Sequence, residues 1–384
     1  MYHYDFDSIT DRRATYASKW EIGENELPMW IADMDFKTDP AVSAALRERI
    51  ERDVMGYTSM PESFYETLIS WQRSRNGYAV EREWVGFCPG VITSINQAYL
   101  TFTDPGDKII VQTPVYNPFF DYAKRLGRVA VENPLIYKDG RYQMDFEGLE
   151  RLFDDRTKLL VLCNPHNPVG ILWDKETLAH LAETCERHGV IVISDEIHSD
   201  LPLFGRRHLP FCSVSPAAER VGMIFSSPSK SFNIAGLAGT AYCIIPDPAK
   251  RKRYLDGLHN AKLSEASVLS VIATIAAYDH EPRWLDDLLA YLGGNVERVV
   301  SFFESNKLGI KAVKPEASFL VWLDCRELAL PQEELMNLFN DKAGVVVNNG
   351  SGYGTGGEGF IRLNVGCPRS VVDEALGRIL RALS

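Results

Sequence analysis

The sequence lacks paired cysteines and long apolar runs. Its seven cysteines are an odd number and none belongs to a C-x-x-C pair, which excludes a disulfide framework and predicts reduced thiols. Apolar runs such as Leu159–Cys163 and Val190–Ile193 are too short to span a bilayer. The first residues show no basic stretch followed by an apolar one, so no signal peptide is expected. We therefore expect a soluble, cytoplasmic protein.

Positive charge is also scarce, because 41 Lys and Arg residues stand against 52 Asp and Glu residues and the formal net charge is -11. An acidic chain without a basic run is repelled by phosphate backbones, so nucleic acid is not an expected partner. Internal repeats, low-complexity segments and Gly/Ser linkers are missing too. The length of 384 residues favours two to three domains.

Short β-branched runs alternate with helical patterns over the central part of the chain. Runs that are apolar on both faces and separated by helices are typical of a parallel sheet covered on both sides. We predict an α/β fold with a mostly parallel sheet. Its strands would be Val85–Cys88, Ile109–Thr113, Leu159–Cys163, Val190–Ser194, Gly222–Ser226 and Ala241–Ile245. Helices are expected at Val91–Phe102, Tyr116–Leu126 and Lys175–His188, the last ended by Gly189.

The remainder of the chain has a different pattern. Helical stretches at Ser267–Tyr278 and Leu285–Phe303 precede short strands at Phe319–Leu323, Val345–Val347 and Phe360–Leu363, and a last helix would begin at a capping box of Ser370 and Asp373. We predict a large domain over residues 46–279. Residues 280–384, joined by an N-terminal arm of residues 1–45, would form a smaller α+β domain.

Polar side chains follow successive strands of the predicted sheet, at the point where each strand ends. Asn167 lies after the third strand, Asp195 after the fourth and Lys230 after the fifth. The carboxyl ends of parallel strands meet at one edge of a sheet, so these side chains should converge on one crevice. Gly90 opens a helix near the same edge, where free N–H groups suit a phosphate.

This combination of groups indicates a pyridoxal phosphate site. A lysine can form a Schiff base with an aldehyde cofactor. Pyridoxal phosphate also needs a carboxylate beside its pyridine nitrogen, a donor near its phenolic oxygen and an anion site for its phosphate. Asp195, Asn167 and the hydroxyl and glycine groups at Ser227, Ser229 and Gly90 meet those needs. Each residue alone is more often a cap or a turn residue, and their joint occurrence carries the prediction.

The same motifs resemble a known family. N-P-x-N-P-x-G, S-D-E-I-H and S-x-S-K-[ST]-F-N occur in this order in fold-type I pyridoxal-phosphate enzymes of the class I/II aminotransferase superfamily. The chain is more specifically similar to the MalY/PatB-type cystathionine β-lyases, or C–S lyases. The segments that carry this similarity are Asp11–Arg13, Lys19–Trp20, Leu27–Phe36, Gly56–Tyr57, Ser229–Leu237 and Phe360–Arg369.

The resemblance implies roles for individual residues. Lys230 would be the Schiff-base lysine, Asp195 the partner of the pyridine nitrogen and Arg362 the clamp for the substrate carboxylate. Asn167 would hydrogen-bond the ring oxygen, and Tyr116 would stack on the ring and border the substrate.

The phosphate site departs in part from the wider superfamily. Tyr57 would reach the phosphate of a neighbouring subunit, which implies a homodimer with a shared active site. Many relatives have an arginine where this chain has Ala238 and a tyrosine where it has His198, which would still border the cofactor; both replacements resemble the C–S lyase branch. The remaining phosphate contacts would come from Gly90, Val91, Ile92, Ser227 and Ser229.

The predicted reaction is α,β-elimination of L-cystathionine or related cysteine S-conjugates to a thiol, pyruvate and ammonia. Two alternatives stay open: an aminotransferase acting on an L-amino acid, and a regulatory protein that retains the fold and the cofactor. A dinucleotide fingerprint at Gly352–Gly357 is rejected because a strand follows it rather than a helix. A metal at Cys163 and His166 is rejected because no second ligand pair exists.

Overall fold

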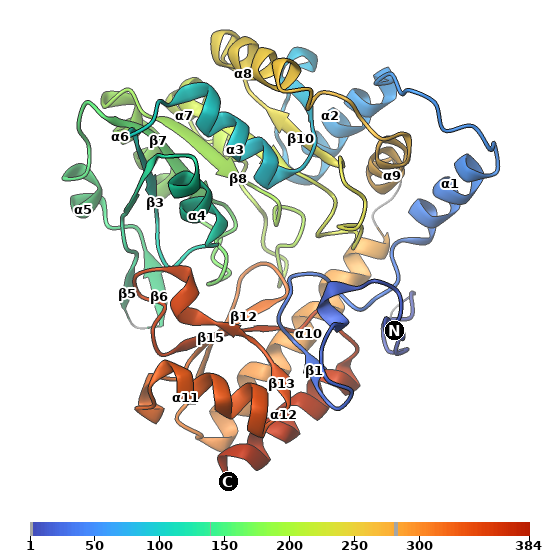
Figure 1. The fold of residues 1–384 in the computed structure, drawn as a ribbon, viewed down its shortest axis with the longest axis vertical. Helices are drawn as coiled ribbons and strands as arrows, with labels where there is room; N and C mark the ends of the chain where they lie inside the picture. The colour runs from blue at the N-terminus through green and yellow to red at the C-terminus, as the bar shows by residue number, and fades with distance from the viewer. Residues whose placement is uncertain (1–2, 139, 280–282) are drawn as a thin grey trace.

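The larger part of the molecule is built around a seven-stranded sheet (Figure 1). The computed structural model describes residues 3–138, 140–279 and 283–384. The strand order is β2-β10-β9-β8-β7-β3-β4, and β10 alone runs opposite to the other six strands of this sheet. The bounds are β2 Val85–Cys88, β3 Lys108–Val111, β4 Val129–Glu132, β7 Thr157–Cys163, β8 Ile191–Asp195, β9 Gly222–Ser226 and β10 Ala241–Ile244.

Helices cover both faces of this sheet because successive strand residues point to opposite sides. In β7, Leu159 and Val161 belong to the core that packs on α3, α4 and α8, whereas Leu160 and Leu162 belong to the core that packs on α2, α6, α7 and α9. The bounds are α2 Glu62–Asn76, α3 Val91–Phe102, α4 Pro118–Arg125, α6 Lys175–Arg187, α7 Pro216–Val221, α8 Pro248–Asn260 and α9 Val268–Tyr278. Helix α1, Pro40–Ile50, packs against α9.

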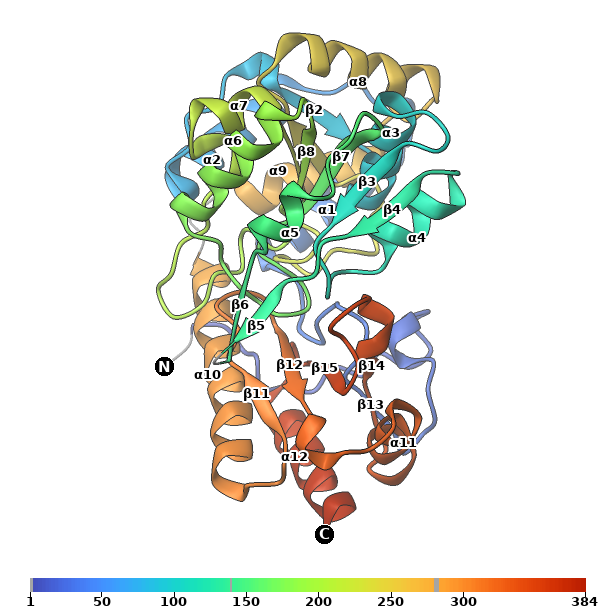
Figure 2. The same cartoon turned by 90° about the vertical axis from the view of Figure 1, so that its left-hand side faces the viewer.

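The smaller part contains a four-stranded antiparallel sheet, seen at the bottom of Figure 2. Its order is β11-β12-β15-β14, and helices α10 and α12 pack against one another beside it. The N-terminal strand β1, Leu27–Pro28, pairs with β13, Val345–Val346, so the start of the chain joins this part. The other bounds are β11 Lys311–Val313, β12 Leu320–Asp324, β14 Asn348–Asn349, β15 Phe360–Asn364, α10 Arg283–Asn306, α11 Gln332–Asn337 and α12 Arg369–Leu383.

The predicted α/β architecture is confirmed, and the predicted strands of the large sheet agree with the structure to within two residues at each end. The helix expected from Tyr116 begins only at Pro118. The capping box is wrong: α12 already begins at Arg369, and the Asp373 carboxylate pairs with Arg298 on α10 instead. The hairpin of β5, Ile136–Lys138, and β6, Arg141–Gln143, and the short helix α5, Phe146–Glu150, were not predicted.

The division into domains at residue 46 and residue 280 stays a prediction, and the second boundary lies outside the described residues. Within the described ranges, no helix is both long enough and apolar enough to cross a membrane.

Candidate active site

A cavity of about 280 Å³ opens at the edge of the large sheet where the parallel strands end. The loops after β2, β7, β8 and β9 converge there, as expected from the sequence. Every predicted site residue except Tyr57 and Arg362 lines this cavity: Gly90, Val91, Ile92, Tyr116, Asn167, Asp195, His198, Ser227, Ser229 and Lys230.

Lys230 lines the cavity and supplies its positively charged side chain. It follows β9 through a tight turn, and its Nζ donates a hydrogen bond of 2.5 Å to the carbonyl oxygen of Ala32 in the N-terminal arm. Burial lowers the pKa of Lys230 to about 8, opposed by the negative charges of Asp33 and Asp195. An amine with this pKa is partly neutral near pH 8 and can act as a base or a nucleophile.

Asp195 ends β8 and faces the same cavity. Its Oδ1 accepts a hydrogen bond of 3.0 Å from the backbone N–H of Ile197. Burial, together with the neighbouring Glu196 carboxylate, raises the pKa of Asp195 to about 7, and the Ile197 hydrogen bond opposes this rise. A buried carboxylate of this kind gains from a cation beside it, so the site favours a positively charged group of the bound molecule next to Asp195.

The anion-binding end of the cavity is formed by the start of α3 and by hydroxyl groups. Gly90 precedes the first turn of this helix, whose free N–H groups suit an anion. The Ser227 Oγ lies 3.0 Å from the Thr240 Oγ1 and accepts a hydrogen bond of 3.1 Å from the Ser229 N–H. Thr240 was missed from the sequence because it precedes β10, whose reversed direction brings the start of that strand to this edge.

Arg362 lies in β15 of the smaller sheet and is connected to the cavity through Asn167. Its guanidinium donates to the Asn167 Oδ1 at 3.0 Å, to the Trp30 carbonyl at 3.0 Å and to the Asn348 Oδ1 at 2.8 Å. Its Nε is buried without a hydrogen-bond partner among the described residues. The Tyr353 ring covers the guanidinium, with 5.3 Å from Cζ to the ring centroid. An arginine held in this way can receive a carboxylate.

The last two predicted residues differ in their surroundings. His198 is buried, its Nδ1 lies 3.1 Å from the Ser318 Oγ, and burial lowers its pKa to about 3, so it is neutral at the cavity wall. Tyr57 is fully exposed and lies away from the cavity of its own chain. Its predicted contact across a subunit interface stays a prediction.

The fold and this site together define the class of the aminotransferase-fold proteins, in which a lysine and an aspartate line one cavity at the carboxyl edge of an α/β sheet. Comparison with known proteins agrees. The family model for "Aminotransferase class I and II" matches residues 25–379. The chain therefore belongs to the class I and II aminotransferase family.

The relatives within this family include two bacterial proteins and a solved structure. The chain is 42% identical to cystathionine beta-lyase PatB of Bacillus subtilis, over 99% of this chain and 100% of PatB. It is 32% identical to protein MalY of Escherichia coli, over 99% of both chains. The crystal structure of the PLP-bound C-S lyase from Staphylococcus hominis superposes with a TM-score of 0.92 at 32% identity, covering 99% of this chain and 98% of that one. The resemblance seen in the sequence motifs is thereby confirmed.

Proposed function

We propose that the protein is a pyridoxal-phosphate-dependent C–S β-lyase, which cleaves L-cystathionine or related cysteine S-conjugates to a thiol, pyruvate and ammonia. The observation that carries this proposal is the lining of one cavity by the half-buried Lys230 and the buried Asp195, within a chain 42% identical to a cystathionine β-lyase. Both groups have pKa values shifted toward neutrality, which is common where proton transfer is catalysed.

The donor set of the cavity fits pyridoxal phosphate. Asp195 would bind the protonated ring nitrogen, because the burial that raises the carboxyl pKa is offset by a facing cation. Asn167 would bind the ring oxygen and Tyr116 would cover the ring face. The phosphate would be held by the start of α3 and by Ser227, Ser229 and Thr240, which line the cavity.

When bound, pyridoxal phosphate withdraws electrons from the Cα of an amino acid, so that the Cα–H and Cβ–S bonds can break. The residues of the chain supply the rest. Arg362 binds the substrate carboxylate with its planar fork and fixes the Cα–H bond toward Lys230. The Lys230 amine takes the Cα proton, which a pKa of about 8 permits near neutral pH. Asp195 holds the proton on the ring nitrogen.

We further propose a cytoplasmic homodimer. Ile50, Val54, Met55 and Tyr57 expose large apolar side chains over one short segment, which is typical of an interaction surface. In the proposed dimer, Tyr57 reaches the phosphate in the active site of the neighbouring subunit. All seven cysteines are buried with free thiols, which fits a reducing compartment.

The proposal is tested with Lys230→Ala, compared with Lys252→Ala on the exposed face of α8. We expect Lys230→Ala to lose the visible absorbance of the cofactor and at least about 10³-fold in thiol release from L-cystathionine. The control should keep both. Unchanged turnover by Lys230→Ala would refute the mechanism, and conversion of the wild-type cofactor to its amine form without thiol release would favour an aminotransferase.

A further inference from the structure

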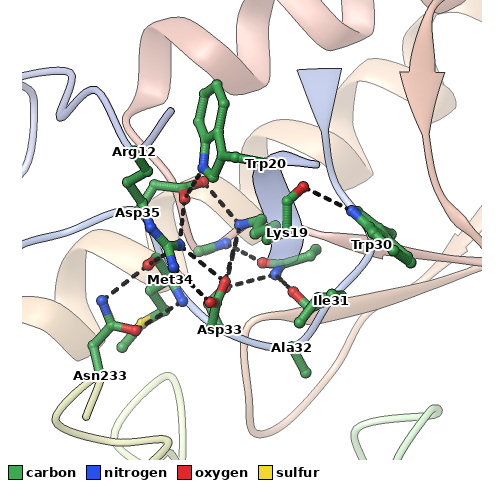
Figure 3. Close-up of polar contacts among 12 residues, drawn as sticks. Arg12, Lys19, Trp20, Trp30, Ile31, Ala32, Asp33, Met34, Asp35 and Asn233 are labelled. Atoms are coloured by element: carbon green, nitrogen blue, oxygen red, sulfur yellow. Dashed lines mark hydrogen bonds and ion pairs between the residues drawn. The ribbon is translucent and has the colours of Figure 1, made fainter. Parts of the chain in front are cut away.

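A network of opposite charges surrounds the segment Trp30–Asp35, outside the cavity already described (Figure 3). Arg12 binds two carboxylates at once: its Nη2 lies 2.7 Å from the Asp33 Oδ2 and its Nη1 lies 2.8 Å from the Asp35 Oδ1. The same Nη1 donates to the Met34 carbonyl at 3.0 Å. One guanidinium therefore ties together three consecutive residues of the segment.

The part of the network around Asp35 is buried. The Lys19 side chain is 0% exposed, and its Nζ lies 2.8 Å from the Asp35 Oδ2. The Trp20 Nε1 donates to the Asp35 Oδ1 at 2.9 Å. By contrast, Arg12 and Asp33 keep 21% and 19% of their side chains exposed. The network thus has a buried half at Asp35 and a partly solvated half at Asp33.

The segment held by this network touches both ends of the proposed active site. The Ala32 carbonyl accepts the hydrogen bond from Lys230, and the Trp30 carbonyl accepts one from Arg362. Asn233, three residues after Lys230, donates to the Met34 and Phe36 carbonyls and accepts from the Met34 N–H. A displacement of the segment would therefore move the acceptor of the lysine.

The network also contributes charge at the lysine. The groups that act on Lys230 are Asp33 from the N-terminal arm, Asp195 at the end of β8 and Arg362 in β15. The other titratable groups of the lining are His198, Tyr116 and Cys163. Among the carboxylates, Asp33 favours the protonated lysine more than Asp195 does. Asp33 has two counterions, Arg12 at 2.7 Å and Lys19 at 3.8 Å. Arg12 is the nearer of the two and so offsets more of the negative charge that acts on the lysine.

We propose that the Arg12–Asp33 ion pair is a positioning element for Lys230, which fixes the segment carrying the Ala32 carbonyl and sets the net charge that the lysine faces. The proposal rests on the proposed function, since it assigns Lys230 to the cofactor. Neither member of the pair lines the cavity. Asp33 acts on Lys230 by its charge and through the Ala32 carbonyl, and Arg12 acts through Asp33.

The test compares two substitutions of one ion pair in the holoenzyme. Asp33→Asn removes the negative charge, so the pH midpoint of the visible cofactor absorbance should fall by about half a unit or more. Arg12→Met removes the nearer of the two cations beside Asp33, so the same midpoint should rise, and the remaining Lys19, whose Nζ lies 3.8 Å from the Asp33 Oδ1, makes this rise smaller than the fall in Asp33→Asn. The acid limb of kcat against pH should move in the same two directions. Arg12→Lys keeps the charge and should restore the midpoint, although kcat falls because the double contact is lost.

A control breaks the surface pair of Arg298 and Asp373, and Arg298→Met should leave the midpoint unchanged. Opposite shifts for Asp33→Asn and Arg12→Met support the proposal, because loss of a purely structural contact would lower the melting temperature in both variants without moving the midpoint. Shifts in the same direction, or no shift, would overturn it. If Arg12→Met does not fold, the pH midpoints of Asp33→Asn and Arg12→Lys are compared instead. Equal midpoints in these two variants overturn the proposal. If the wild-type holoenzyme shows no change of visible cofactor absorbance with pH, the result instead refutes the proposed function.

Discussion

Asp195→Asn should stabilise the cofactor-free protein while it inactivates the enzyme. The asparagine keeps the shape of the side chain and the Oδ1 that accepts the Ile197 N–H. It removes a carboxyl group that is 4% exposed and whose pKa burial raises to about 7. A buried acid with a raised pKa pays a desolvation cost when it ionises in the folded chain, whereas in the unfolded chain it ionises in water.

The magnitude follows from the difference between the two pKa values. The unfolded carboxyl titrates near 3.8 and the folded one near 7, so the folded chain binds more protons between these values and its stability falls as pH rises. The cost is absent below about pH 4 and complete above pH 7. At about 1.4 kcal/mol for each unit, the folded wild-type chain loses up to about 4 kcal/mol across this window.

The assay is the melting temperature of both cofactor-free proteins from pH 4 to pH 8. His198 and His166 also make stability depend on pH in this range, because burial lowers their pKa values to about 3 and about 4 in the folded chain, whereas in the unfolded chain they titrate near 6.5. The difference between variant and wild type is therefore the quantity to follow. That difference should grow in favour of Asp195→Asn as pH rises from 4 to 7 and then level off. A difference that stays constant with pH, or that favours the wild type at pH 8, would refute the reasoning.

Three further predictions concern binding, packing and assembly. Arg362→Lys should raise KM about tenfold with a smaller change in kcat, measured by steady-state kinetics, because an ammonium cannot make the double contact with a carboxylate. Gly170→Ala should destabilise the chain by about 1–3 kcal/mol in urea unfolding, since a Cβ there would lie 2.3 Å from the Pro315 Cβ at a φ of +70°. Gly189→Ala, with a φ of +66° and no atom within 4 Å, should cost only about 1 kcal/mol. Tyr57→Phe should weaken cofactor affinity in a cofactor titration without lowering the melting temperature, and an unchanged affinity would argue against its place at a shared site.

The sequence predicted the architecture and the convergence of the catalytic loops because both depend on local patterns. Strands buried on both faces and separated by helices place Asn167, Asp195 and Lys230 at one edge whatever the details of packing. The direction of β10 could not be predicted, since an apolar run has the same pattern in either direction, and for that reason Thr240 was missed.

Contacts between segments distant in the chain could not be predicted from the sequence either. Asp33 and Asp35 lie in the segment Leu27–Phe36, which contributed only to the family resemblance, and nothing in their spacing predicts that Arg12 binds both of them. The contact of the Ala32 carbonyl with Lys230 joins residues 198 positions apart, and such a contact depends on how two parts of the fold pack together. The capping box failed for a similar reason, because Asp373 pairs with Arg298 across two helices.

The most direct test of the account is pyruvate release from L-cystathionine by the purified, cofactor-loaded protein with no 2-oxo acid added. The account predicts pyruvate and free thiol in equal amounts over many turnovers. Absence of pyruvate together with conversion of the cofactor to its pyridoxamine form would contradict it, since the protein would then transfer the amino group instead of cleaving the carbon–sulfur bond.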